Sequence, residues 1–248
     1  MSIISGYNIK RFYQSGTIRT DVLRGIDIAV EAGEFLAIMG KSGAGKSTLL
    51  YQLSALDRPN SGNIFIDGKD ILDFSEAELV NFRLFTLGYI FQDYALIPDL
   101  NAEENVLLPL LMRGLDWETA WTRAQAALES VSLINRNTNL PSQLSGGEQQ
   151  RVAIARAIAG KPKIIFADEP TANLDSASGK AVIEILRQLH HSGQTIVMVT
   201  HETEYTAYCN RIVYLEDGLI IPEKSHLVYP KPLLNSDYLN TSLNKGSI

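Results

Sequence analysis

The sequence has little of several features that mark particular classes of protein. It contains a single cysteine, Cys209, so no disulfide bond can form within the chain, as expected of a cytosolic protein. No stretch approaches the roughly 20 consecutive apolar residues that a membrane-spanning helix needs. Residues 1–6 lack the basic start and the apolar run of a signal peptide. Any role at a membrane is therefore expected to depend on a partner chain.

A basic surface is missing as well. The chain has 22 Lys and Arg residues against 28 Asp and Glu, a formal net charge of −6, and the two signs are interspersed. This balance argues against a nucleic acid as partner, because nucleic acids bind clustered positive charge. What is present is a hydrophobic content of 45% in 248 residues, enough for a large core. We expect one domain with subdomains and find no internal repeat.

Residues 40–48 form a glycine-rich segment between an apolar run and a helical pattern. Residues 35–39 predict a buried strand, and a helix is expected to begin at Gly45 and to include residues 47–53. In such a context backbone N–H groups and the helix dipole converge on phosphate oxygens. Lys46 can then reach the β- and γ-phosphates, Ser47 can ligate Mg²⁺, and the Lys41 side chain is expected to point outward. The predicted nucleotide contacts are Gly40, Lys41, Ser42, Gly43, Ala44, Gly45, Lys46, Ser47 and Thr48.

An acidic pair follows the buried strand that is predicted over residues 163–167. A carboxylate at the carboxyl end of a parallel strand lies where phosphates bind. Asp168 is predicted to hold Mg²⁺ through water, and Glu169 to polarise the attacking water as general base. Alone, the pair would fit an ordinary turn at a helix start equally well. The phosphate loop favours the catalytic interpretation.

His201 follows the next predicted core strand, residues 195–200, and can contact the γ-phosphate from there. A histidine at a strand end is more often without such a role. The other three histidines, His190, His191 and His226, have no comparable setting and are expected at the surface.

The remaining patterns predict how the chain is organised. Hairpins are expected at Asp67-Gly68 and at Asp217-Gly218, dipeptides that favour tight two-residue turns. Helical spacing predicts helices over residues 76–85, 102–112, 117–131 and 177–190, with Asn101 and Asp116 placed as caps. Strands that alternate with helices imply a parallel sheet with right-handed crossovers. Residues 223–248 show no period, and we expect an ordered patch there at most.

A second glycine-rich segment, residues 144–151, reads Leu-Ser-Gly-Gly-Glu-Gln-Gln-Arg and precedes a basic amphipathic helix predicted over residues 152–158. Together with the phosphate loop and the acidic pair, it resembles the nucleotide-binding subunit of ATP-binding-cassette (ABC) proteins over residues 7 to about 223. Residues 13–16, 20–23, 55–62, 94–100 and 104–106 are similar to one branch of that family, the ATPases of lipoprotein release, macrolide export and cell division.

The resemblance implies a fold and a mode of action. The fold would be an α/β P-loop ATPase core with an antiparallel β subdomain and an inserted α-helical subdomain. Residues 1–222 would form the nucleotide-binding domain, with the helical subdomain at about 93–159 and a C-terminal tail at 223–248. ATP would drive two such subunits into a head-to-tail homodimer with ATP and Mg²⁺ at the interface.

Further site residues are implied by the resemblance alone. The signature segment, Ser145, Gly146 and Gly147, would bind the γ-phosphate of ATP held by the partner subunit. Asp175 would belong to a segment that crosses the dimer interface. Gln92 would sense Mg²⁺ or the attacking water. Tyr13 would stack on adenine, although a packed strand tyrosine remains an open alternative.

The resemblance also implies membrane partners. The subunit would attach to transmembrane permease subunits at the cytoplasmic face of the inner membrane. The attachment surface is expected near residues 91–105, where Leu96, Ile97, Pro98 and Leu100 would present apolar area. Two alternatives remain open: a regulatory cell-division ATPase that moves no cargo, and a soluble ATPase of the iron–sulfur-assembly type. The cargo and the direction of transport are not encoded in recognisable residues of this chain.

Overall fold

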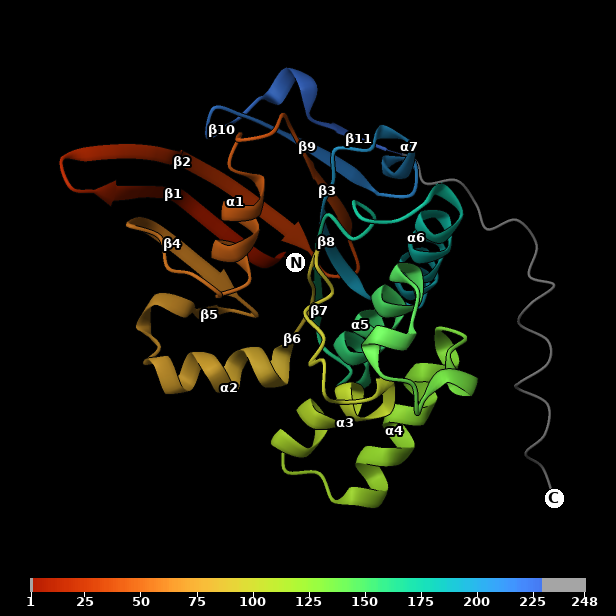
Figure 1. The fold of residues 1–248 in the computed structure, drawn as a ribbon. Coiled ribbons are helices and arrows are strands. Elements are labelled where there is room, and N and C mark those ends of the chain that lie inside the picture. Colours follow the sequence, from red (N-terminus) through yellow and green to blue (C-terminus); the bar gives the residue numbers. More distant parts are fainter. Residues whose placement is uncertain (1, 229–248) are drawn as a thin grey trace.

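The structure, a computed structural model, describes residues 2–228 and consists of two β-sheets and a group of helices (Figure 1). The strands are β1 (Ser2–Ser15), β2 (Ile18–Glu31), β3 (Phe35–Met39), β4 (Ser61–Ile66), β5 (Lys69–Asp70), β6 (Leu87–Ile90), β7 (Ile164–Asp168), β8 (Thr195–Val199), β9 (Arg211–Glu216), β10 (Leu219–Ile220) and β11 (His226–Leu227). The α-helices are α1 (Lys46–Leu53), α2 (Glu76–Thr86), α3 (Ala102–Met112), α4 (Trp117–Ser130), α5 (Gly146–Ala159), α6 (Ser176–His191) and α7 (Thr203–Thr206).

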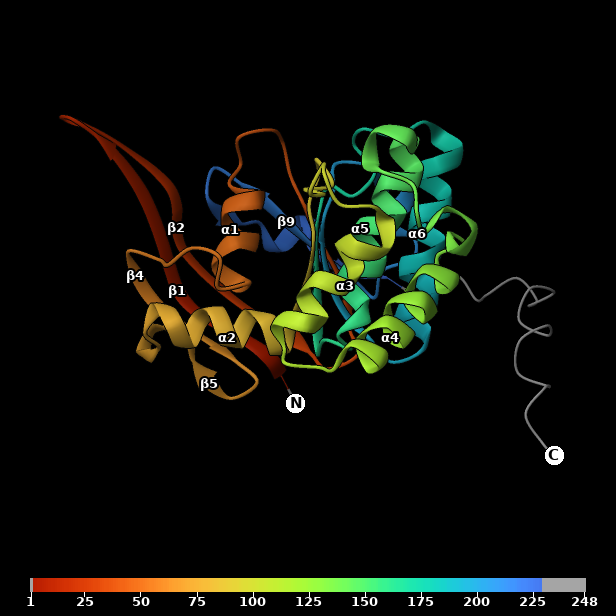
Figure 2. The same cartoon turned by 60° about the horizontal axis from the view of Figure 1, so that its bottom comes forward.

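The first sheet is antiparallel and has the strand order β2-β1-β4-β5. Its β1–β2 hairpin projects away from the rest of the molecule (Figure 2). The β4–β5 turn lies at the predicted position, with φ values of 52° at Asp67 and 75° at Gly68. Two consecutive left-handed residues match the right-handed twist of the flanking strands, which is why Asp-Gly predicts such turns well.

The second sheet has the order β10-β9-β3-β8-β7-β6, and β11 pairs with β9. The strands β9, β3, β8, β7 and β6 run parallel, as the alternation of strands and helices predicts. Their carboxyl ends therefore meet at one edge, where β3 leads into the phosphate loop and β7 ends at Asp168. This edge positions the candidate site.

The core lies on both faces of this sheet. Alternate residues of each strand point to opposite sides, so Phe35 and Ala37 of β3 pack with the helical layer, whereas Leu36 and Ile38 pack toward the antiparallel sheet and α1. Figure 1 shows the same arrangement, with the antiparallel sheet on one side and α5 and α6 on the other. The sheet thus fixes the phosphate loop between two packed layers.

The inserted helices begin where their caps predict. The Asn101 side chain accepts from Glu104 N at the start of α3, and Asp116 accepts from Thr119 N at the start of α4. The expected helix over residues 152–158 is longer than predicted: α5 already begins at Gly146. A capping box between Ser145 and Glu148 explains the earlier start. The glycines of the signature segment therefore belong to the first turn of a helix rather than to a free loop.

The C-terminal part contains a hairpin at Asp217-Gly218, as predicted, followed by a short ordered patch. Residues 226 and 227 pair with β9, and Val228 N donates to Asn210 O at 2.7 Å. The rest of the predicted tail, residues 229–248, lies outside the described residues. Within residues 2–228, no helix combines the length and the apolar character needed to cross a membrane.

Candidate functional site

The phosphate loop encloses a cavity of about 300 Å³ between β3 and α1. Gly40 has a φ of 150°, and a Cβ atom there would lie 2.1 Å from Leu215 O. Gly45, the cap of α1, has a φ of 98°. Both positions exclude a side chain, because the backbone is left-handed and neighbouring groups approach closely. The lining residues are Val22, Ser42, Gly43, Gly45, Lys46, Ser47, Thr48 and Glu169.

The two lysines of the loop differ in their surroundings. Lys46 is buried, and its Nζ donates to Lys41 O at 3.1 Å and lies 3.8 Å from Glu169 Oε1. The Lys41 side chain is 77% exposed and extends toward Glu216, with its Nζ 3.7 Å from Oε1. Of the two, only Lys46 has its charge inside the cavity.

Ser47 and Asp168 form the candidate magnesium site. The Ser47 hydroxyl donates to Asp168 Oδ1 at 2.9 Å, and Asp168 is 4% exposed. Burial raises the pKa of the Asp168 carboxyl, and hydrogen bonds from Ser47 and Tyr51 act in the opposite direction. Within residues 2–228 no cluster of three or more His, Cys, Asp or Glu side chains could hold a metal alone. A hydroxyl beside a carboxylate fits Mg²⁺, which takes one or two protein oxygens together with substrate phosphates.

Glu169 lies directly after β7 in a backbone conformation with a φ of 42°. Its N–H donates to Val199 O of the neighbouring strand at 3.0 Å. Its two carboxylate oxygens face two nitrogens: Oε1 faces Lys46 Nζ, and Oε2 lies 3.1 Å from His201 Nδ1. The structure thus brings together the predicted base, the predicted phosphate lysine and the predicted histidine.

Other predicted site residues lie apart from this group. Gln92 is exposed, and in the described part of the chain its side chain bonds to neither Ser47 nor Asp168. Tyr13 is 46% exposed, with the Arg11 guanidinium 4.7 Å from its ring centroid. The carboxylate of Asp175 caps α6. Hydrogen bonds from Ser178, by its N–H and its hydroxyl, and then from Ala177 N lower the pKa of this carboxyl.

The signature segment does not line the phosphate-loop cavity. Ser145 is exposed and its Oγ accepts from Glu148 N at 3.3 Å, so the hydroxyl proton remains available to an acceptor. Gly147 is buried, and a Cβ atom there would lie 2.7 Å from Ser178 Oγ. The segment thus forms the N-terminal end of α5, where the helix dipole favours an anion.

Three expectations about other residues need correction. His190 is not a surface residue: it is half-buried, with its ring 5.7 Å from that of Phe35. Of the expected attachment residues, Leu96 packs against the core and Leu100 is half-buried, so only Ile97 and Pro98 of the four are exposed. Asn105 fixes the course of this loop, because its side chain bonds to the backbone of Ile97 and Leu100.

Sequence reasoning missed several residues around the site. Tyr51 of α1 bonds to Asp168, and Asn105 orders the loop before α3. Arg156 of α5 donates to the carbonyl oxygens of Tyr94 and Ala95. The only signal in the sequence was their type, polar or aromatic groups within apolar segments. The partners of Tyr51 and Arg156 lie too far along the chain for a pattern to reveal.

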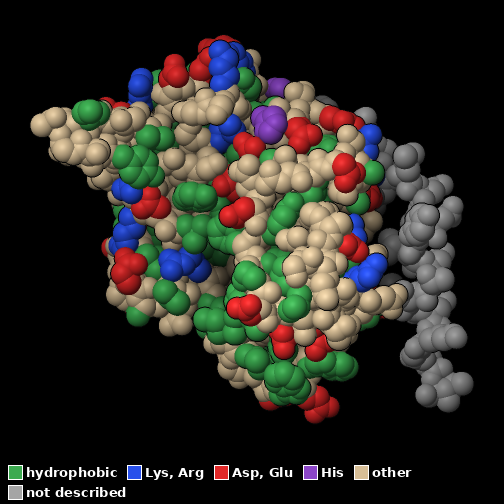
Figure 3. Space-filling view, in the orientation of Figure 1, with side chains coloured by type: hydrophobic (Ala, Val, Ile, Leu, Met, Phe, Trp, Pro, Cys, Tyr) green, Lys and Arg blue, Asp and Glu red, His purple; other side chains and the backbone are tan. Residues whose placement is uncertain are grey.

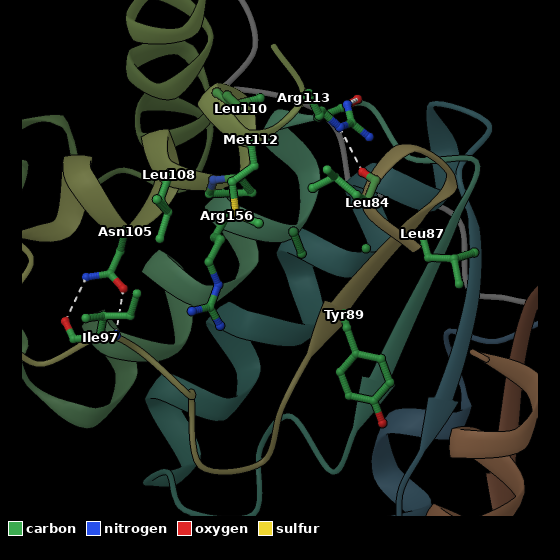
Figure 4. A pocket seen from close by; sticks show the side chains of 14 residues that line it. Leu84, Leu87, Tyr89, Ile97, Asn105, Leu108, Leu110, Met112, Arg113 and Arg156 are labelled. Atoms are coloured by element: carbon green, nitrogen blue, oxygen red, sulfur yellow. Dashed lines mark hydrogen bonds between the residues drawn. The ribbon is translucent and has the colours of Figure 1, made fainter. Parts of the chain in front are cut away.

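A largely apolar groove of about 270 Å³ lies between α2–β6 and the helices α3 and α5 (Figure 4). Arg113 donates to Leu84 O across it, and Asn105 holds Ile97 at its other end. Ile97, Leu108 and Met112 are its exposed apolar residues, at 40%, 36% and 61%. In Figure 3 hydrophobic side chains also gather at the lower end of the molecule, over the helical layer.

Comparison with known proteins connects these features. Residues 23–172 match the ABC transporter family. The chain is 45% identical over 218 residues to an uncharacterized ABC transporter ATP-binding protein, YknY, of Bacillus subtilis, covering 88% of this chain and 95% of that protein. It is 44% identical over 225 residues to the macrolide export ATP-binding/permease protein MacB of Neisseria meningitidis, covering 91% of this chain but 35% of MacB.

A solved structure is similar as well. The ATP-binding cassette MJ0796, in a dimeric post-hydrolysis state bound to ADP and Pi, superimposes with a TM-score of 0.85 at 38% identity. The match covers 91% of this chain and 99% of that one. The expected fold, a P-loop α/β core with an antiparallel sheet and inserted helices, is thereby confirmed.

Proposed function

This chain belongs to the ABC transporter family as an ATP-binding, ATP-hydrolysing subunit, and we propose that it hydrolyses ATP with Mg²⁺ in a head-to-tail dimer beneath transmembrane permease subunits. The observation that carries the proposal is the convergence of Lys46, Ser47, Asp168 and Glu169 at the mouth of one cavity. This is the arrangement that in-line phosphoryl transfer to water requires.

Each residue has a proposed part in the reaction. Backbone N–H groups of the loop and the buried Lys46 ammonium hold the phosphates. Mg²⁺, held by Ser47 and Asp168, would neutralise charge that develops on the transferred phosphoryl group. Glu169 accepts a proton from the attacking water, and His201 fixes the carboxylate through the contact at Oε2. Gln92 is proposed to approach Mg²⁺ or the water only when nucleotide is bound.

The signature segment is proposed to complete the site of a second copy. In one chain it stands outside the cavity of the phosphate loop, and its Ser145 is exposed at a helix N-terminus. A γ-phosphate brought there by a partner would meet the positive end of the α5 dipole. The dimeric state of MJ0796 supports this arrangement. Asp175 is proposed to lie at the dimer interface, and Tyr13 to stack on adenine.

A permease segment is proposed to occupy the apolar groove. Ile97, Leu108 and Met112 expose apolar area along it, which a helix from a membrane subunit would cover. The ATP-binding and permease parts joined in MacB support a permease as partner. The subunit would then lie at the cytoplasmic face of the inner membrane. Co-purification with a permease separates this proposal from a soluble iron–sulfur-assembly ATPase.

The test is the variant Glu169→Gln, which keeps shape but removes the proton acceptor. Turnover with Mg²⁺ and ATP should fall by about 10²–10⁴-fold, while ATP binding persists. ATP should also convert the variant from monomer to a lasting dimer, because the step that opens the dimer is lost. Glu184→Gln, a carboxylate on α6 away from the cavity, is the matched control. Near-normal turnover of Glu169→Gln would contradict the assigned base, and absence of an ATP-driven dimer would contradict the composite site.

A further inference from the structure

Residues 94 and 95 follow the end of β6 and have an unusual backbone. Tyr94 has a φ of 65° and Ala95 a φ of 49°. L-residues other than glycine rarely adopt this left-handed backbone conformation. Two such residues in a row persist only where the surrounding structure holds them. Within this turn, Ala95 N donates to Asp93 O at 2.7 Å. Tyr94 N donates to Phe91 O at 3.3 Å, and the carbonyl groups of Tyr94 and Ala95 are held from elsewhere in the chain.

Arg156 of α5 supplies that support. Its Nη1 donates to Ala95 O at 2.5 Å and its Nη2 to Tyr94 O at 2.8 Å. In residues 2–228 no carboxylate forms a salt bridge with Arg156, and its two hydrogen bonds both go to the strained turn. A planar guanidinium can serve two adjacent carbonyl groups at fixed geometry, which an ammonium cannot.

The turn places the Tyr94 side chain between two other segments. Its hydroxyl donates to Asn173 O at 3.4 Å, and Asn173 Nδ2 in turn donates to Gln92 O at 3.1 Å. The same hydroxyl lies against the signature segment: a Cβ atom on Gly146 would lie only 2.8 Å from it. One side chain thus contacts the segment before Asp175 and the first turn of α5, and its own backbone continues from Gln92.

We propose that Tyr94 is a positioning residue that links the ATP site of its own subunit to the signature segment of that subunit, which binds the ATP of the partner. Arg156 holds Tyr94 in place. The inference rests on the proposed dimer with composite sites. Tyr94 touches neither nucleotide: a displacement of Gln92 by the subunit's own ATP and Mg²⁺ shifts Tyr94, and its hydroxyl shifts Gly146. This contact leaves no room for a side chain at position 146, because any residue larger than glycine would meet the Tyr94 hydroxyl.

The test is a double-mutant cycle in the Glu169→Gln background, with the ATP-driven dimer measured by light scattering. Tyr94→Phe removes one hydrogen bond and should weaken the dimer by about two- to tenfold. The affinity of the monomer for ATP, measured by calorimetry, should change by less than about twofold, because no nucleotide contact is lost. Gly146→Ala should weaken the dimer more, because its methyl group displaces the hydroxyl.

The decisive measurement is the coupling between these two changes. In a Tyr94→Phe subunit the methyl group of Ala at 146 has room, since the next atoms, Leu174 Cδ2 and Tyr94 Cζ, lie 3.6 and 3.7 Å away. The added effect of Gly146→Ala should therefore shrink at least about threefold. Gly147→Ala is the matched control: its methyl group meets Ser178 at 2.7 Å, so its effect should be equal with and without the Tyr94 hydroxyl.

The inference would be overturned if the effects of Tyr94→Phe and Gly146→Ala on dimerisation were additive. It would also be overturned if Tyr94→Phe reduced the effect of Gly147→Ala as much as that of Gly146→Ala. These outcomes leave the proposed function standing, because the Glu169→Gln parent still dimerises. A parent that fails to dimerise with ATP would instead overturn the composite site and the inference together. Arg156→Lys should reproduce the weakened dimer in the parent and add little in the Tyr94→Phe background. An undiminished effect there would show that Arg156 does not act through Tyr94.

Discussion

The Nδ1 atom of His201 lies 3.1 Å from Oε2 of Glu169, at the ends of two neighbouring parallel strands. The register of β7 and β8 pairs Asp168 with Val199, so the residues that follow these two positions emerge side by side. The contact is therefore set by the sheet itself. It fixes the orientation of the carboxylate while leaving its other oxygen 3.8 Å from Lys46 Nζ. If Glu169 is the base, as we propose, its carboxylate is already oriented for a water that arrives with ATP.

Lys46 and Lys41 should differ sharply when each is replaced by alanine. Lys46→Ala removes the buried charge of the cavity, and ATP affinity should fall by about 10- to 100-fold. Lys41→Ala removes an exposed charge beside Glu216 and should change affinity by less than about threefold. Calorimetric titration with ATP and Mg²⁺ measures both. Equal losses would show that the loop is placed wrongly.

The elements that short-range chemistry determines were predictable from the sequence. The turn at Asp67-Gly68, the caps Asn101 and Asp116, and the loop around Lys46 each depend on residues within one turn of chain. The side-by-side position of Asp168 and Ser47 also followed, because parallel strands share an edge.

The parts that sequence reasoning missed depend on contacts between distant segments. The half-burial of Leu96 follows from packing on the core, and that of His190 from the ring of Phe35. The support of Tyr94 by Arg156 joins residues 62 positions apart. No local pattern specifies such a pair. The start of α5 at Gly146 was within reach, because Ser145 and Glu148 have the spacing of a capping box.

The apolar groove yields a prediction about assembly. Ile97→Asp places a charge on an exposed apolar residue of the groove and should weaken binding to the permease at least about tenfold, because burial of an unpaired charge is unfavourable. Basal ATPase of the isolated subunit should stay near normal. Leu219→Asp, a similarly exposed position at 42% on β10, is the matched control. Leu96→Asp is unsuitable, because this side chain packs on the core. Recovery of the complex with Ile97→Asp in a pull-down would refute the proposal that the permease binds in this groove.

His190 gives the stability of the protein a pH dependence of known sign. Burial, and then the nearby His191, lowers the pKa of His190 below its usual value of 6.5. As the pH falls through 6.5, the unfolded chain takes up this proton before the folded chain does. The free energy of unfolding should therefore decrease with acidification until the pH lies below the folded-state pKa. Urea denaturation between pH 7.5 and about 5 should show a smaller decrease for His190→Gln than for wild type. His191→Gln should keep most of the wild-type decrease in the free energy of unfolding. If this free energy fell equally with pH in His190→Gln and in wild type, His190 would not be the cause.

The signature segment supports the most discriminating prediction. Ser145→Arg puts a large side chain where the γ-phosphate of a partner's ATP would lie, so dimerisation and hydrolysis should be lost. ATP affinity of the monomer should remain, because Ser145 does not line the phosphate-loop cavity. The change also removes the cap of α5, a loss of about 1 kcal/mol. Ser145→Ala, which loses the cap and the hydroxyl donor but adds no charge, and Ser142→Arg, which adds the same charge at a nearby exposed residue, separate these effects.

Mixing Ser145→Arg with Lys46→Ala subunits then tests whether the site is shared. In a head-to-tail dimer of the two, one site combines both lesions, and the other combines an intact phosphate loop with an intact signature segment. Some hydrolysis should return in the mixture, although each variant alone is inactive. If one chain instead supplied both segments to its own ATP, every site in the mixture would carry one lesion and no activity could return. Loss of ATP affinity in monomeric Ser145→Arg would point to that same arrangement, because the signature segment would then bind the nucleotide of its own subunit.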